Sequence, residues 1–173
     1  MTDDNRRSTV RRQAELPFDW RPMAGDPDLP AAVRALALPP GIALQADLAD
    51  ADASIERALG AVDDRAVAEA LRAVAAKVSL VADAVLAEVP VPAPRPLALS
   101  AEGVGFVDDQ PVDEGSAIAV HLILPPGRHV VCAAEVTRCE AAGAHWRIGA
   151  SFRGLDAATA RALTRFTIRR DTD

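Results

Sequence analysis

Four prolines at alternate positions, Pro90, Pro92, Pro94 and Pro96, divide this sequence into two parts with different hydrophobic periods. No proline occurs from residue 44 to residue 89, and apolar residues recur there at steps of three and four, the spacing of a helix. After residue 96 apolar and polar residues alternate, which is typical of strands with one buried face. Because proline cannot continue a helix and alternate prolines form a stiff chain, the sequence predicts a long helix, a rigid connection and then a β-rich domain.

The helical part carries an unbroken heptad seam. Its members are Val67, Leu71, Val74, Val78, Val81 and Val85. Two arrangements are open: the seam lies on the chain's own β-rich domain, or it pairs with other copies of the chain. A seam of valine and alanine buries little area alone, and β-branched residues at both core positions favour more than two strands, so self-association is favoured. Asp63 and Asp64 interrupt the phase before the seam, which predicts a helix break or a stutter.

The β-rich part contains three segments with a period of two, 117–124, 130–138 and 145–152, separated by glycine-containing turns. The residues expected to share one face of their strand are Ile118, Val120, Leu122, Leu124, then Val130, Cys132, Ala134, Val136, and then Trp146, Ile148, Ala150 and Phe152. Asp156 is expected to cap a terminal helix that buries Leu163 and Phe166. Short antiparallel strands closed by a helix predict an α+β fold built on a small antiparallel barrel.

The rest of the chain completes the expected organisation. Residues 1–14 form a mobile basic tail, and residues 15–43 hold a first strand (15–20) and a proline-rich connection. Pro17 restricts that strand to an edge or a bulge. Residues 44–89 form a helical oligomerisation insertion, and residues 96–170 form the barrel with its closing helix, in one domain with 15–20.

Composition excludes several classes of protein. A net charge of −6 argues against binding a nucleic-acid polymer, which needs a basic surface. No apolar run approaches the roughly 20 residues of a membrane span, and no signal peptide is visible, so a cytoplasmic protein is expected.

The residues capable of chemistry show no constellation. His121, His129 and His145 are dispersed, so neither a metal site nor a general base is expected, and Ser100 and Glu102 have no histidine partner. Cys132 and Cys139 are seven residues apart, which puts them on opposite faces of one strand as free thiols. The chain is therefore expected not to be an enzyme and to need no cofactor.

Three motifs in order resemble a PilZ domain: the turn Ser100-x-x-Gly103, the turn at Gly115, and Gly149-x-x-Phe152 before the closing helix. Together with the inserted heptad helix, the chain is similar to the atypical PilZ family. That family is labelled a cyclic di-GMP receptor family and includes a tetramer built on a parallel coiled coil. The resemblance implies a β-barrel that binds a bacterial second messenger without chemistry, and a homo-oligomer, with a tetramer favoured.

The resemblance also implies ligand-binding residues. Arg7 and Arg11 match the Arg-x-x-x-Arg arm that grips cyclic di-GMP over the Ser100 and Gly103 turn. Ligand-binding PilZ domains carry Asp or Asn two positions before the serine, where this chain has Ala98, and losing a polar anchor costs about 1–3 kcal/mol. Two functions stay open: a cyclic di-GMP receptor or adaptor, and an assembly module that has lost the ligand and works through unidentified signalling proteins.

Overall fold

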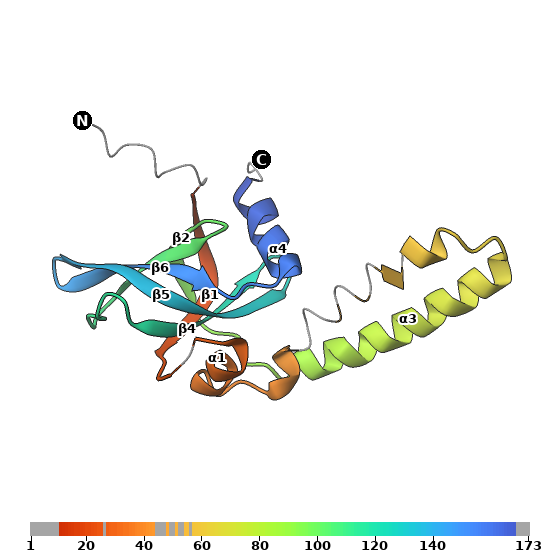
Figure 1. Cartoon of the computed structure of the whole chain (residues 1–173), viewed down its shortest axis with the longest axis horizontal. Coiled ribbons are helices and arrows are strands. Elements are labelled where there is room, and N and C mark those ends of the chain that lie inside the picture. Colours follow the sequence, from red (N-terminus) through yellow and green to blue (C-terminus); the bar gives the residue numbers. More distant parts are fainter. Residues whose placement is uncertain are drawn as a thin grey trace. The chain divides into compact units, whose positions relative to one another are not determined.

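The computed structural model describes residues 11–25, 27–43, 48, 51, 54–55 and 57–168, without the side chains of residues 40, 43, 83, 85 and 86. Six antiparallel strands close a barrel in the order β1-β2-β3-β6-β5-β4 (Figure 1). The strands are β1 (Arg12–Pro22), β2 (Pro94–Leu99), β3 (Gly103–Asp108), β4 (Ala117–Leu124), β5 (Arg128–Ala142) and β6 (His145–Arg153). The helices are α1 (Leu29–Ala35), the 3-10 helix η1 (Pro40–Ala43), α3 (Arg65–Leu86) and α4 (Ala157–Ile168). The predicted α+β fold, a small antiparallel barrel with helices, is confirmed.

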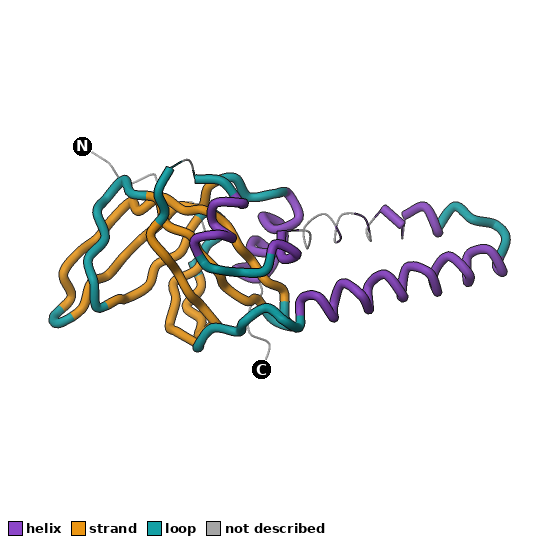
Figure 2. Tube along the Cα trace, turned by 90° about the horizontal axis from the view of Figure 1, so that it is seen from below, coloured by secondary structure: helices purple, strands orange, loops and turns teal. Residues whose placement is uncertain are grey.

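The chain divides into two compact units. One contains the described residues up to Ala37 and from Val91 onward, and the other is Leu38–Pro90. The first unit holds the whole barrel with α1 and α4, and its strands (orange) surround the interior in Figure 2. The second unit holds η1 and α3.

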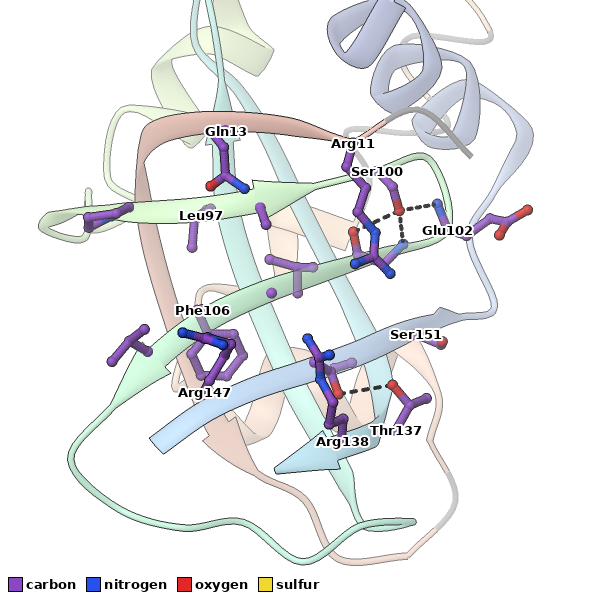
Figure 3. A pocket seen from close by; sticks show the side chains of 18 residues that line it. Arg11, Gln13, Leu97, Ser100, Glu102, Phe106, Thr137, Arg138, Arg147 and Ser151 are labelled. Atoms are coloured by element: carbon purple, nitrogen blue, oxygen red, sulfur yellow. Dashed lines mark hydrogen bonds between the residues drawn. The ribbon is translucent and has the colours of Figure 1, made fainter. Parts of the chain in front are cut away.

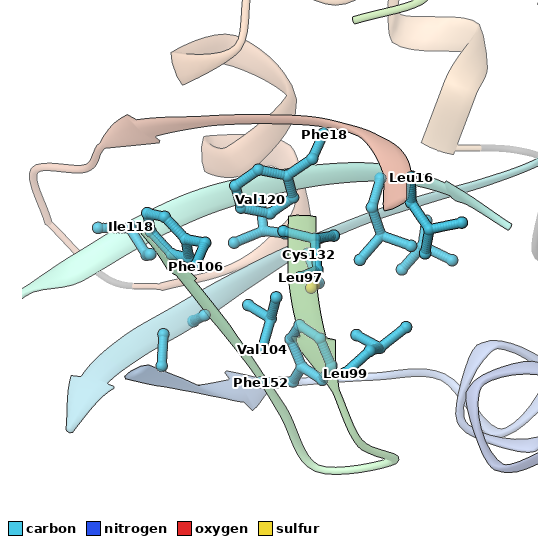
Figure 4. Packing of buried hydrophobic residues seen from close by; sticks show 14 of the residues in the cluster. Leu16, Phe18, Leu97, Leu99, Val104, Phe106, Ile118, Val120, Cys132 and Phe152 are labelled. Carbon is cyan, nitrogen blue, oxygen red and sulfur yellow. The ribbon is translucent and has the colours of Figure 1, made fainter. Parts of the chain in front are cut away.

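The interior of the barrel is filled by the inward faces of all six strands (Figure 4). Every residue predicted to share one face of β4, β5 or β6 belongs to this core or packs against it. Phe18 and Phe106 meet there with ring centroids 4.9 Å apart. The alternation in the sequence therefore predicted these faces correctly. It did not predict that the outer face of β4 is also buried, where α1 packs on β4 and β5.

Strand β1 is longer than predicted and has two partners. Residues 12–17 pair with β2, and residues 18–22 pair with β4. Because the barrel is closed, the expected edge position of Pro17 is wrong. Pro17, which has no N–H to donate, is the last residue paired with β2 and lies where the strand changes partner.

Strand β5 contains a β-bulge between Val136 and Arg138, opposite β6. The bulge shifts the alternation by one residue, so Cys139 packs against the core just as Cys132 and Val136 do. The two cysteines are free thiols, but the prediction that they lie on opposite faces of the strand is wrong, because the extra residue restores the phase.

Helix α4 begins and packs as expected. The Asp156 carboxylate accepts a hydrogen bond from the Thr159 amide at 2.8 Å, and Leu163 is completely buried. The Arg12 guanidinium lies 4.5 Å from the centroid of the Phe166 ring and donates to the Phe166 carbonyl oxygen at 2.9 Å. These two contacts hold the start of β1 against the last turn of α4.

Helix α3 starts after a break, not a stutter. The Asp64 carboxylate accepts from the amides of Ala66 and Val67, at 2.9 and 3.2 Å, and so caps the helix. Of the predicted seam, the Val85 side chain lies outside the described residues; Val67, Leu71, Val74, Val78 and Val81 are 45–66% exposed. None of the helices in the described residues has the length and apolar character needed to cross a bilayer.

Candidate functional site: a groove on the barrel surface

A groove of about 830 Å³ runs over the outer face of the barrel (Figure 3). Its floor consists of Ala98, Gly105 and Gly149, which are neighbours on β2, β3 and β6. Outward-facing positions of a barrel normally carry larger side chains, and these three adjacent positions carry none beyond a methyl group. The backbone is therefore open to close approach by a ligand.

The Ser100 turn forms one end of the groove. The Ser100 hydroxyl accepts from the amides of Glu102 and Gly103, at 3.3 and 3.1 Å, and donates to the Gly103 carbonyl oxygen at 3.2 Å. A side chain at Gly103 would collide with the Ala150 carbonyl oxygen of β6. Both residues of the Ser-x-x-Gly motif thus have a structural role, which is to hold the β2–β3 turn closely against β6.

Three of the four residues expected to bind the ligand come together. Arg11, Ser100 and Gly103 all line the groove, whereas Arg7 lies outside the described residues. Within the part of the chain that the structure describes, no residue forms a hydrogen bond or ion pair with the Arg11 side chain, which points over the groove in Figure 3. Ala98, the residue two positions before Ser100, forms part of the floor.

The sequence analysis missed two further arginines of the groove, Arg138 and Arg147. Arg138 belongs to the β-bulge, and Arg147 lies two residues before Gly149 on β6. The groove is lined by Arg11, Arg138 and Arg147 and by one acidic residue, Glu102, so it is basic in a chain of net charge −6. One signal in the sequence was available: the three-residue step between the apolar positions Val136 and Cys139, which breaks the period of two.

Asp108 and His121, two ionisable groups of the barrel outside the groove, have partners within the fold. Although burial raises the pKa of Asp108, hydrogen bonds from Trp20 and Arg95 hold it below its usual value. The Arg95 guanidinium forms an ion pair with the Asp108 carboxylate, with 2.9 Å between nitrogen and oxygen. Burial lowers the pKa of His121 to about 4, and its Nε2 lies 2.9 Å from Nδ1 of His129. The described residues contain no cluster of three or more groups suited to a metal ion.

A comparison with solved structures found similar chains of low sequence identity. One is a pathogenic protein from Xanthomonas campestris, described as a new tetrameric PilZ domain self-assembled via an unusual helical bundle. It is 18% identical, with a TM-score of 0.53 over 93% of this chain and 87% of that chain. Another is the inhibitor of motility MotI/DgrA of Bacillus subtilis, 13% identical with a TM-score of 0.48, where the match covers 95% of this chain and 51% of that one.

No curated protein sequence matches the chain. The family model of the PilZ domain, however, matches residues 72–169. This match covers more than half of the sequence and includes β2 to β6 and α4, the elements that carry the Ser-x-x-Gly turn and most of the groove. The chain therefore belongs to the PilZ domain family.

Proposed function

We propose that this PilZ protein is a non-catalytic receptor that binds cyclic di-GMP in the groove on its barrel. The observation that carries the proposal is the convergence of Arg11, Ser100 and Gly103 on one basic groove of about 830 Å³. That volume lies within the roughly 300–1,000 Å³ of small-molecule sites. A net basic lining suits a ligand with two phosphates, since each guanidinium can donate two parallel hydrogen bonds to phosphate.

The two arginines that precede β1 would hold the ligand's phosphates. Arg7 and Arg11 are four residues apart, and both can grip phosphate or stack on a guanine. Ser100 and Gly103 serve by keeping the β2–β3 turn close to β6, which leaves the groove open beside them. Ala98 offers no polar side chain, so the ligand loses one anchor and the proposed affinity depends more on the arginines.

Calorimetry with cyclic di-GMP tests the proposal. The wild-type protein is expected to bind at micromolar concentration, and the double variant Arg7→Ala/Arg11→Ala is expected to lose binding. Arg21→Ala is the matched control, because Arg21 is an exposed arginine at the other end of β1 and is paired with Asp19. Absence of heat with folded wild-type protein, or equal loss in the control, would contradict the receptor function.

The second candidate function is an interaction and assembly module, and the exposed seam of α3 favours it. Five apolar side chains at heptad positions are at least 45% exposed, which is unusual for a helix that works alone. Burial of this seam against other copies would make a homo-oligomer, and the tetrameric neighbour with its helical bundle supports that arrangement. In this function the barrel would present a surface to signalling proteins, and cyclic di-GMP would not be required.

A further inference from the structure

The β-bulge of β5 directs two consecutive side chains into the groove. In a regular strand neighbouring side chains point to opposite faces. Here Val136 and Cys139 both pack on the core side, and Thr137 and Arg138 between them are both exposed and line the groove. Thr137 fixes this geometry, because its hydroxyl donates to the Gly149 carbonyl oxygen at 3.1 Å (Figure 3). Bulges are frequent beside functional sites, where they change the direction of a side chain.

Arg138 and Arg147 lie on the β5–β6 side of the groove, while Arg11 precedes β1 on the other side. Arg138 pairs in register with Gly149, Gly149 pairs with Gly105, and Gly105 pairs with Ala98. Three strand spacings of about 4.8 Å therefore separate the backbone at Ala98 from that at Arg138, a span of about 14 Å. The floor between them has the width of a dinucleotide, which is too large for a single phosphate to bridge.

Neither arginine is fully neutralised by the protein. The Arg138 guanidinium lies 3.7 Å from the Glu140 carboxylate, a long contact between exposed groups that contributes little. Arg147 forms no hydrogen bond or ion pair with any other described residue. Both side chains are therefore available to bind an anion. They lie on the opposite side of the floor from Arg11 (Figure 3).

We propose that Arg138 and Arg147 form a second anion subsite, which holds one phosphate of a ligand whose other phosphate is held by Arg11. The ligand class is a cyclic dinucleotide, with a planar base lying on the floor of Ala98, Gly105 and Gly149. This inference rests on the proposed receptor function. It also gives a physical reason why Ala98 is compatible with binding: a methyl group at that position keeps the floor flat, and cationic side chains of β5 and β6 replace the missing polar anchor.

The glycine of the floor permits a test that is separate from charge. A Cβ at Gly149 would lie 3.8 Å from its nearest neighbours, Arg138 Cβ and Thr137 Oγ1, which is ordinary van der Waals contact. The barrel therefore tolerates Gly149→Ala, but the added methyl group stands on the floor where the base would lie.

The experiment is calorimetry with cyclic di-GMP on Arg138→Gln, Arg147→Gln and Gly149→Ala. Each variant is expected to melt like the wild type and to bind at least tenfold more weakly. The two arginine variants lose charge-assisted hydrogen bonds to a phosphate, and the methyl group of Gly149→Ala occupies the place of the base. The matched control is Arg153→Gln, which removes another exposed arginine of β6 that pairs with Glu135 outside the groove. GMP, which carries one phosphate, is expected to bind more weakly than cyclic di-GMP and to lose less on Arg138→Gln.

The outcomes separate this inference from the function on which it rests. Wild-type binding that is lost in Arg11→Ala but unchanged in the Arg138 and Arg147 variants would overturn the second subsite and leave the receptor standing. Unchanged binding by Gly149→Ala would overturn the placement of the base on the floor. Failure of the folded wild type to bind would overturn both proposals together.

Discussion

Gly103 and Gly149 show how one residue type serves two purposes on the same barrel face. At Gly103 the backbone of β3 is so close to β6 that any side chain would meet the Ala150 carbonyl oxygen. At Gly149 there is room for a methyl group, so the absence of a side chain is not required by packing within the barrel. The first glycine therefore belongs to the fold and the second to the groove.

This difference predicts opposite effects on stability. Gly103→Ala is expected to lower the free energy of unfolding by about 1–3 kcal/mol, because the strands must move apart to admit the methyl group. Gly149→Ala is expected to change it by less than about 1 kcal/mol. Urea unfolding followed by tryptophan fluorescence measures both, since Trp20 and Trp146 pack against the barrel core. Equal destabilisation by the two variants would contradict the assignment.

The His121–His129 pair predicts a pH dependence of stability. Burial lowers the pKa of His121 from 6.5 to about 4 and also lowers the pKa of His129. Near pH 6.5 these histidines therefore bind protons in the unfolded chain but not in the folded chain. The free energy of unfolding falls as the pH drops from about 6.5 toward about 4. The slope is up to about 1.4 kcal/mol per pH unit for each histidine.

Urea midpoints measured between pH 7.5 and pH 4.5 test this dependence. His121→Gln is expected to flatten the profile, because it removes the group from both states. His145→Gln is the matched control, because it removes an exposed histidine that lies outside the buried pair. A profile as steep in His121→Gln as in the wild type would refute the role of the buried pair.

At the scale of elements, α3 has two distinct faces. The seam of Val67, Leu71, Val74, Val78 and Val81 is exposed, whereas Ala68 is buried and Ala75, Ser79 and Ala82 are half-buried. Small residues thus occupy the side that the chain itself covers, and the larger apolar residues occupy the side that it leaves open. In the proposed assembly, a second copy of the chain covers this seam.

Val78→Asp is expected to convert the proposed oligomer to monomers in sedimentation experiments, because a charge in the middle of the seam cannot be buried without a partner. Ala76→Asp places the same charge about 200° round the helix from Val78, on an exposed face, and should leave assembly unchanged. An assembly that persists in Val78→Asp, or is lost in both variants, would contradict pairing through this seam.

The strands show which features were predictable from the sequence. The core faces of β4, β5 and β6 follow from alternation, because each residue's side is fixed by a local period of two. The bulge at Thr137 and the partner change at Pro17 do not follow, since both depend on the register against other strands. The candidate site divides in the same way: the Ser100 turn is local and was found, whereas Arg138 and Arg147 reach the groove only through the pairing of β3, β6 and β5.

At the scale of the whole molecule, the barrel does not depend on the insertion for its interior. All described residues of the core cluster, and those packed against it, lie before residue 38 or after residue 90. Both tryptophans are among them, so tryptophan fluorescence reports on the barrel alone. The insertion carries the seam, and the barrel carries the groove. The two proposed functions, assembly and ligand binding, therefore fall on separate parts of one chain.

Excision of the insertion tests that separation. Ala37 would be joined to Val91 by a Gly/Ser linker of about ten residues, whose root-mean-square span is roughly 17 Å. The excised protein is expected to unfold cooperatively, to sediment as a monomer and to keep its affinity for cyclic di-GMP. Its stability should be equal or slightly higher, because each halving of a connection lowers the entropy cost of closing it by about 0.6 kcal/mol. A folded monomer that no longer binds the ligand would show that the groove needs the assembly, and an unfolded product would show that the barrel needs the insertion.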